Sequence, residues 1–472
     1  MRLDHFRLAT SVILLLALAI STFGTTNRKE DFQPQAVKSD LDFSELDKLV
    51  PAELKERNTP GAVIVVIMGD RVVYQKAFGV ANVETNAPMQ TDMLFRLGST
   101  TKMFTAAALV ALAEQEKIKL DEPIGNRVKG LSTKVGQVTL NYLLSNSAGV
   151  RDFAAPFVSN DDEALAKMVR SWKDEVFFAD QGEIYSYSSA GFWLSGMVLE
   201  EITGKPYADA MAEVIFKPLG MERTTLRPLL AMTYPLANAH AIENGKPIII
   251  RPFFNNVAMW PAGSIFSNAN DLSRWVIALL NEGRVEGKQV LPVSLPGKLA
   301  TGHIPVPGET DSYYAYGLTT FKYKGLQFVG HGGFSRGYGS MIQMVPEKKF
   351  AVITLANKSG ETMRKTMNKA MEIAINLKDD QPDKPAPFAP LTKTEMTDYV
   401  GSYSHAPQLF EVSVKEDKLF LKLDGKEYQL TKSGERKFTY GESNENELVF
   451  VPGKSGKIDF VFWELYGAKR VK

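Results

Sequence analysis

Ser99 and Lys102 have the residue types and the spacing of a nucleophile and its base. They lie in RLGSTTKMFTAAALVALAEQEK (96–117), where apolar residues from Met103 to Ala113 predict a helix that begins just after a glycine. Residues three apart share one face of a helix, so the Lys102 amine is expected beside the Ser99 hydroxyl. A serine hydroxyl needs an adjacent base to become a nucleophile, and a lysine serves when its pKa is lowered. The pair predicts a serine nucleophile, with a plain helix N-cap at Ser99 as the alternative.

Two other segments offer groups that such a nucleophile needs. Tyr187 stands in SYSS (186–189), just before a predicted helix, where its hydroxyl would exchange protons with Ser99 and a leaving group. His331-Gly332-Gly333 follows the strand-like run LQFVG, and its glycines allow close approach to the backbone. A main-chain N–H there, paired with that of Ser99, would form an oxyanion hole. Each segment alone also fits a non-catalytic role, as a capping tyrosine or as a structural histidine.

In this order, the three segments resemble the active-site motifs of the serine β-lactamase and penicillin-binding protein superfamily. The likeness is greatest to its class C-like branch of esterases, D-amino-acid peptidases and related hydrolases, and it covers residues 47–376. Ser99 and Lys102 match S-x-x-K, Tyr187 matches the tyrosine of Y-x-N, and residues 331–333 match K-T-G in its H-x-G form. Supporting matches are WPAGSIFS (260–267), LLS (143–145) and EEITGKPYADAM (200–211).

The resemblance implies roles for particular residues. Catalysis would fall to Ser99, Lys102 and Tyr187, through an acyl-enzyme. The oxyanion hole would consist of the backbone N–H groups of Ser99 and Phe334. The expected substrate-binding residues are Asn146, Ser189, His331, Gly332 and Gly333. No cofactor and no metal are expected.

The chain also departs from the family pattern at several positions. The asparagine of Y-x-N is Ser189, the usual H-T-S-G loop reads NSAG (146–149), and the usual P-G-T reads QGE (181–183). His331 replaces a lysine that would hold a substrate carboxylate. This replacement argues against efficient β-lactam hydrolysis and favours ester or peptide substrates, including D-amino-acid peptides.

The elements that must position these residues predict an α+β fold. Strand-like runs at 62–68, 71–79, 326–331, 338–346 and 350–357 flank a mostly helical region from about 120 to 285, with predicted helices at 161–174, 190–204, 206–216, 270–283 and 361–376. Strands at both ends with helices between them predict an antiparallel sheet with an inserted helical region, as the β-lactamase/transpeptidase-like resemblance implies.

The chain divides further towards its C-terminus. A catalytic domain at 47–376 is followed by a proline-rich linker at 377–390 and by an all-β region at 391–472. Short alternating strands in that last region, of which KIDFVFWELYG (457–467) is the last, predict a small barrel or sandwich. It resembles the lipocalin-like domain that follows some of these hydrolases, and a generic β module is the alternative.

The N-terminus predicts export. MRLDHFR precedes the uncharged run LATSVILLLALAISTF, which is the layout of a signal peptide, here placed at 1–24 and followed by a lead-in segment at 25–46. The protein is therefore expected to be periplasmic or secreted, with membrane contact only if this segment stays uncleaved.

Composition excludes several other classes of protein. A net charge of +1 gives no reason to expect a nucleic-acid partner, and the absence of cysteine excludes thiol chemistry and disulfides. The five histidines lack metal-ligand spacing. GFSRG (333–337) matches the G-x-S-x-G elbow, but a strand rather than a helix is predicted after it. The expected partner is a small-molecule or peptide substrate, and the oligomeric state is left open.

Three interpretations follow. The first is an exported serine hydrolase, an esterase or a peptidase. The second is a penicillin-binding or sensor-type protein that acylates without efficient turnover, or a weak β-lactamase. The third is a degenerate scaffold whose β-domain binds a ligand.

Overall fold

The computed structural model describes residues 41–378, 388, 389, 391–443 and 445–471. The predicted signal peptide, the lead-in up to residue 40 and most of the predicted linker lie outside these residues. Within the described ranges, no helix combines the length and the apolar character needed to cross a membrane.

The core of the fold is a nine-stranded antiparallel sheet in the order β10-β11-β12-β13-β14-β15-β1-β2-β3. β1 pairs with its sequence neighbour β2 and also with the distant β15, where Val65 faces Ile353. The sheet therefore joins both ends of the domain, which confirms the predicted fold class. Its strands are β1 (Gly61–Met68), β2 (Arg71–Asn82), β3 (Ala87–Pro88), β10 (Ile304–Pro305), β11 (Ser312–Tyr314), β12 (Thr319–Tyr323), β13 (Leu326–Ser335), β14 (Tyr338–Val345) and β15 (Phe350–Ala356).

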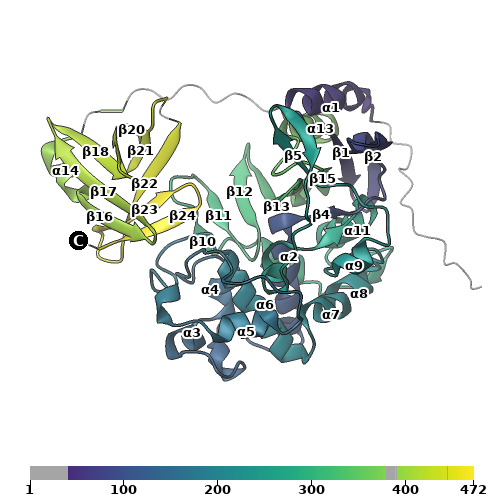
Figure 1. The fold of residues 1–472 in the computed structure, drawn as a ribbon, viewed down its shortest axis with the longest axis horizontal. Coiled ribbons are helices and arrows are strands. Elements are labelled where there is room, and N and C mark those ends of the chain that lie inside the picture. The colour runs from purple at the N-terminus through teal and green to yellow at the C-terminus, as the bar shows by residue number, and fades with distance from the viewer. Residues whose placement is uncertain (1–40, 379–387, 390, 444, 472) are drawn as a thin grey trace, which may run out of the picture. The chain divides into compact units, whose positions relative to one another are not determined.

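Helices cover both faces of this sheet. β1 is buried almost throughout, because alternate side chains enter different cores. Val66 packs in a cluster with residues of α1 (Ser44–Glu56) and α13 (Arg364–Ile375), whereas Val63 and Val65 join the main core with α2 (Thr101–Glu114) and α11 (Ala269–Leu280). Figure 1 shows α1 and α13 side by side against β1 and β15.

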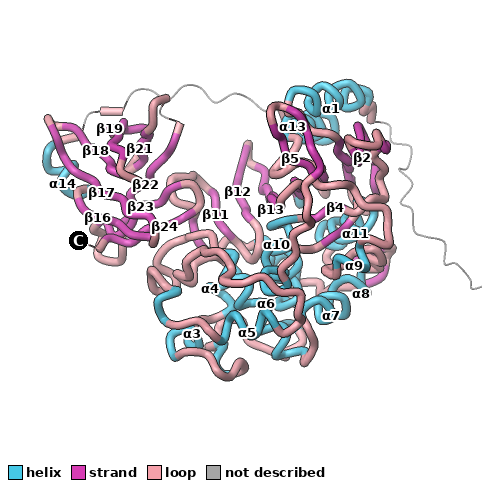
Figure 2. The backbone as a smooth tube through the Cα atoms, viewed as in Figure 1, coloured by secondary structure: helices cyan, strands magenta, loops and turns pink. Residues whose placement is uncertain are grey.

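The region between β2 and β10 is mainly helical, as predicted (Figure 2). Its other helices are α3 (Thr133–Gln137), α4 (Leu140–Leu144), α5 (Ala164–Arg170), α6 (Ser189–Thr203), α7 (Tyr207–Met211), α8 (Lys217–Leu219), α9 (Pro228–Ala231), α10 (Trp260–Gly263) and α12 (Leu295–Ala300). Short strand pairs link its loops: β4 (Phe95–Arg96) with β7 (Phe266–Ser267), β5 (His240–Glu243) with β6 (Lys246–Ile249), and β8 (Arg284–Val285) with β9 (Lys288–Gln289).

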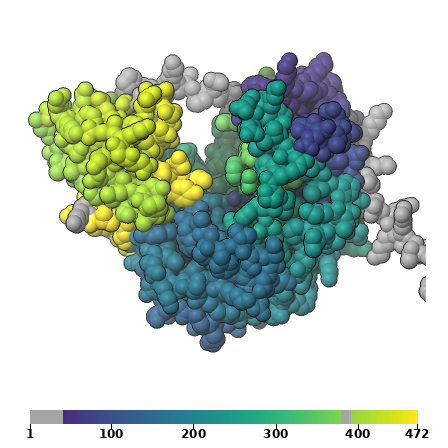
Figure 3. All heavy atoms as spheres, viewed as in Figure 1, coloured from purple at the N-terminus to yellow at the C-terminus, as the bar shows by residue number. Residues whose placement is uncertain are grey.

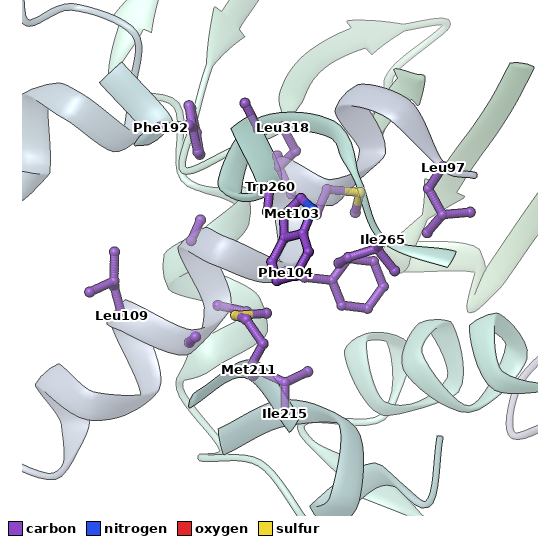
Figure 4. Packing of buried hydrophobic residues seen from close by; sticks show 14 of the residues in the cluster. Leu97, Met103, Phe104, Leu109, Phe192, Met211, Ile215, Trp260, Ile265 and Leu318 are labelled. Carbon is purple, nitrogen blue, oxygen red and sulfur yellow. The ribbon is translucent and has the colours of Figure 1, made fainter. Parts of the chain in front are cut away.

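α2 is the central helix of this region. It is buried on all sides, which explains why its apolar residues do not form a single stripe. Figure 4 shows Met103, Phe104 and Leu109 of α2 packed among side chains from several other segments. This close packing holds α2, which carries Lys102, in place.

The C-terminal region is a second antiparallel sheet of nine strands that forms a nearly closed barrel, in the order β19-β18-β17-β16-β24-β23-β22-β21-β20. The strands are β16 (Gly401–His405), β17 (Gln408–Lys415), β18 (Lys418–Leu423), β19 (Lys426–Gln429), β20 (Thr431–Gly434), β21 (Lys437–Tyr440), β22 (Asn446–Pro452), β23 (Ile458–Trp463) and β24 (Tyr466–Arg470). A helix, α14 (Lys393–Tyr399), precedes them. The all-β prediction is confirmed, apart from this helix.

Two predicted boundaries are wrong. The run 457–467 was expected as one strand, but a turn at Glu464-Leu465 divides it into β23 and β24. The strand at 326–331 was expected to end at His331, but β13 continues to Ser335, because its pairing with β14 runs through both glycines. Ser335 is therefore followed by a hairpin, and the helix that a G-x-S-x-G elbow needs is absent from the described stretch after it.

Candidate active site

Two glycines bring the turn that carries Ser99 against β13. Gly98 has a φ of +56°, and a Cβ added there would lie 2.3 Å from the Phe334 carbonyl oxygen. A Cβ on Gly333 would lie 1.8 Å from the Leu97 carbonyl oxygen. No side chain fits at either contact, so the close approach depends on glycine at both positions. It places Ser99 beside the strand segment that contains Phe334.

Buried hydroxyl groups hold the same approach. Ser340 Oγ donates to the Leu97 carbonyl oxygen at 2.7 Å and lies 2.8 Å from Thr100 Oγ1. Thr100 Oγ1 in turn donates to the His331 carbonyl oxygen at 3.3 Å. The turn before α2 is thus tied to both β13 and β14.

Gly333→Ala is expected to destabilise the protein by about 2 kcal/mol or more, because the new methyl group would push backbone away from backbone. Activity on an ester substrate should fall more than a hundredfold, since the Ser99 turn must move. Gly332→Ala is the matched control for the loss of stability, because the nearest atom to its Cβ would be the flexible end of Met341 at 3.1 Å. Thermal melts and initial rates of both variants test this. Equal effects at the two positions would contradict the assigned geometry.

Lys102 is fully buried and points at Ser99. Its Nζ lies 3.3 Å from Ser99 Oγ, 3.5 Å from Ser189 Oγ and 2.9 Å from the Ala262 carbonyl oxygen. Burial lowers the pKa of Lys102 from 10.5 to about 7, and the Asp152 carboxylate opposes that change. A substantial fraction of this amine is therefore neutral at neutral pH and able to accept a proton.

Tyr187 completes the group. Its hydroxyl faces Ser99, and the centroid of its ring lies 4.6 Å from Lys102 Nζ. Burial raises its pKa well above 10, although the Ser99 contact opposes the change. Tyr187 therefore keeps its proton across the neutral range. The structure thus brings together the three residues predicted to be catalytic.

Backbone hydrogen bonds fix the segment around Tyr187 from two directions. Asn146 accepts from the Ser186 N–H through its carbonyl oxygen and from the Ser188 N–H through Oδ1. From the barrel, the Leu465 carbonyl oxygen accepts from the Tyr187 N–H at 2.8 Å. Asn146 therefore holds the backbone on both sides of Tyr187 in place. Its contact with substrate stays a prediction.

The turn between β23 and β24 lies against the strand-like segment that carries Tyr187. The Gly467 N–H donates to Ser186 Oγ at 3.1 Å, and Lys469 pairs with Glu183 at 3.0 Å. In the space-filling view, the last strands (yellow) pack directly on the helical region (blue) (Figure 3). These contacts were not predicted, because about 280 residues separate the partners and no local pattern marks them.

His331 is buried and contacts Tyr314. Its Nδ1 faces the Gly332 carbonyl oxygen, an acceptor only, so Nδ1 carries the proton and Nε2 accepts from the Tyr314 hydroxyl at 3.0 Å. Burial lowers the pKa of His331 to about 4, with Lys102 adding to the effect. The ring is therefore neutral and does not replace the positive charge of the family's lysine. Its centroid lies 6.1 Å from that of Tyr187.

Asp152 is a site residue that the sequence analysis missed. Its Oδ1 accepts from the Ser189 N–H at 2.8 Å, and its Oδ2 accepts from the Tyr466 hydroxyl at 3.4 Å. It therefore lies at the N-terminus of α6, where a carboxylate is favoured. Its burial raises its pKa, whereas the backbone N–H groups and Lys102 oppose the change. The only signal in the sequence was an acidic residue three positions after Gly149.

The remaining predicted site residues are placed as follows. Ser189 lies at the start of α6 with its hydroxyl towards Lys102. Phe334 is on β13 with an exposed side chain. No group of three or more His, Cys, Asp or Glu residues within the described ranges is arranged to hold a metal ion.

Comparison with known proteins agrees with this geometry. The β-lactamase family model matches residues 46–375. Penicillin-binding protein 4 of Amycolatopsis lactamdurans is 25% identical over 315 residues, covering 64% of this chain and 82% of that protein. Unguisins hydrolase ungD' of Aspergillus campestris is 29% identical over 337 residues, covering 67% of this chain and 61% of that protein.

A solved structure shares the architecture over nearly the whole chain. The crystal structure of SurE superposes with a TM-score of 0.73 at 20% identity, and the match covers 91% of this chain and 99% of that one. At this identity the likeness concerns the fold, and it extends beyond the 46–375 match into the C-terminal barrel. Because the family model accounts for most of the chain, the protein belongs to the β-lactamase family.

Proposed function

We propose that this protein is a serine hydrolase that forms an acyl-enzyme on Ser99 with an ester or peptide substrate. The observation that carries the proposal is the buried Lys102 amine, with its lowered pKa, 3.3 Å from Ser99 Oγ. Family membership and the hydrolase among the relatives support it. Ser99 lies in the short 3-10 helix Gly98–Thr100 that leads directly into α2, where the helix dipole favours a developing anion.

Each group has one task in this mechanism. Ser99 Oγ attacks the substrate carbonyl as Lys102 takes its proton, and the backbone N–H groups of Ser99 and Phe334 hold the oxyanion. Tyr187, which stays protonated, passes a proton to the leaving group and accepts one in return through Lys102. In the second half, the same groups activate water against the ester bond on Ser99, and Ser99 leaves with its proton restored.

The rate is expected to rise with pH around a midpoint near 7, the value to which burial lowers the pKa of Lys102. Only the neutral amine accepts the Ser99 proton, so kcat/KM should fall about tenfold per unit below the midpoint. His331, with a pKa of about 4, and Tyr187, with a pKa well above 10, do not titrate in this range. Initial rates with p-nitrophenyl butyrate between pH 5 and 9, corrected for spontaneous hydrolysis, test this. A midpoint above 9 would contradict a neutral Lys102.

A time course with p-nitrophenyl butyrate tests the function itself. We expect sustained release of p-nitrophenol over many turnovers. An irreversible fluorophosphonate should also stop the reaction and add its mass to the peptide that contains Ser99. Absence of turnover together with absence of labelling at Ser99 would overturn the proposal.

The second candidate function is a penicillin-binding or sensor protein that acylates without efficient turnover. It is favoured by Ser189, which stands where the family has an asparagine and whose hydroxyl is 3.5 Å from Lys102 Nζ. A single stoichiometric burst in the same time course, with a stable adduct after exposure to a β-lactam, would identify it.

A further inference from the structure

A pocket of about 670 Å³ opens beside the catalytic group and is lined from both domains. On the catalytic side it begins at Ser189 and Asp152, and on the barrel side it is bounded by the turns that contain Asp424 and Glu464. Because the Ser189 hydroxyl contacts Lys102, this pocket is placed to receive one end of a substrate whose carbonyl lies at Ser99.

The charge that lines this pocket is negative. Three carboxylates line it, those of Asp152, Asp424 and Glu464, and the lining includes neither lysine nor arginine. Among the described residues, Asp424 and Glu464 form no ion pair, whereas Asp152 is partly balanced by Lys102. His405 adds no positive charge at neutral pH, because burial lowers its pKa and its Nδ1 faces the Gly467 carbonyl oxygen.

The carboxylates converge on the same space. Burial raises the pKa of Tyr466 to about 12, and the charges of Asp152 and Glu464 add to the effect. Burial likewise raises the pKa of Tyr440, with contributions from Glu464 and Asp424. Tyr466 is thus close to carboxylates from both sides of the pocket, and Tyr440 is close to the two carboxylates of the barrel.

Aromatic rings form a large part of the rest of the wall. The centroids of Trp463, Tyr466 and His405 lie within 6 Å of one another, and Tyr440 and Trp193 also line the pocket. Trp193 is 1% exposed, and its indole N–H has no hydrogen-bond partner within the described residues. Aromatic faces attract organic cations independently of any carboxylate.

We infer that this pocket selects substrates that carry an amine or quaternary ammonium group, held between the aromatic rings and the Asp424 and Glu464 carboxylates. This inference rests on the proposed function, because it names the substrate class of the same site. The contribution of the barrel to catalysis is then specificity, supplied by two hairpin turns.

Two pairs of esters test the inference. One pair places the charge in the acyl group, as the p-nitrophenyl ester of γ-trimethylammoniobutyric acid and the ester of its neutral tert-butyl isostere. The other places it in the alcohol, as butyrylcholine and its tert-butyl isostere. In one pair at least, we expect kcat/KM to favour the cation by about tenfold or more. The same ratio near one in both pairs would overturn the inference.

Variants locate the effect. Glu464→Gln and Asp424→Asn, combined, should lower the cation-to-neutral ratio at least about threefold, and raising the salt concentration should lower it in the wild type. Glu416→Gln is the matched control, because Glu416 is exposed at the opposite end of β18 from Asp424. The ratio is the readout, so a change in overall rate does not imitate the result. An unchanged ratio in the double variant would overturn the assignment of these carboxylates.

A binding measurement separates this inference from the proposed function. Benzyltrimethylammonium should change the tryptophan fluorescence of Ser99→Ala saturably, because Trp193 and Trp463 line the pocket. Sodium chloride at equal ionic strength should not, and the double variant should bind at least about threefold more weakly. If no ester is hydrolysed, the proposed function fails and this titration alone decides. Absence of saturable binding would then overturn the inference.

Discussion

Ser99→Ala is expected to lower kcat for p-nitrophenyl butyrate by about 10⁴-fold or more, to the level that binding and the oxyanion hole alone provide. The variant removes the only atom that can form the acyl bond and leaves the surrounding hydrogen bonds to Lys102 largely in place. Its melting temperature should therefore stay close to that of the wild type. Steady-state kinetics and thermal melts of the purified protein test both statements.

Ser195→Ala is the matched control for this substitution. Ser195 is also a buried serine, but its hydroxyl donates only to the Gly191 carbonyl oxygen within α6. Its loss should leave kcat within about twofold. If Ser99→Ala kept a tenth of the wild-type rate, another nucleophile would be responsible.

The parts of this site that were predictable from sequence are those set by local spacing. The helix after Gly98 places Lys102 one turn from Ser99, and the hairpin of β1 and β2 follows from a Gly-Asp turn between two β-rich runs. The fold class followed from strands at both ends of the domain. Each of these inferences uses a local sequence pattern or the order of such patterns along the chain.

The residues that were missed depend on contacts between distant segments. Tyr314 contacts His331 because β11 and β13 belong to one sheet. Asp152 belongs to the site because its carboxylate accepts a hydrogen bond from the Ser189 N–H at the start of α6. Tyr466 contacts Asp152 from the start of β24, directly after a turn that lies within the single strand predicted at 457–467. The apolar run from Phe460 to Trp463 resumes at Leu465 after a single charged residue, so the pattern alone does not reveal that turn.

Lys102→Met is expected to remove activity and, at pH 6, to stabilise the protein. Loss of the base should lower kcat about 10³-fold or more, as for other members of a catalytic triad. The gain in stability arises because the lysine pKa is 10.5 unfolded and about 7 folded. This difference corresponds to a cost of roughly 4–5 kcal/mol for burying the cation. Methionine fills similar space without a charge.

The free-energy cost of burying Lys102 depends on pH. Between pH 7 and 10.5, Lys102 is protonated in the unfolded chain but neutral in the folded protein. The free-energy cost of burying it is therefore fully present below pH 7 and decreases as the pH rises towards 10.5. Loss of the contacts to Ser99, Ser189 and Ala262 offsets part of the gain in stability, by roughly 1 kcal/mol for each contact. We therefore expect Lys102→Met to raise the free energy of unfolding by about 1–2 kcal/mol at pH 6. At pH 9 the remaining cost of the buried lysine is only roughly 2 kcal/mol, so the lost contacts outweigh it and the variant is expected to be about 1 kcal/mol less stable than the wild type.

Denaturant unfolding of both proteins at the two pH values measures this difference. Lys119→Met is the control, because Lys119 is exposed just beyond α2 and should change neither activity nor stability. A Lys102→Met variant that is less stable than the wild type at pH 6 would show that the folded protein holds Lys102 as a well-compensated cation. The same result would remove the base from the proposed mechanism. Stability and activity are thus opposed at one buried amine, since the site gains its base by accepting a group that the core disfavours.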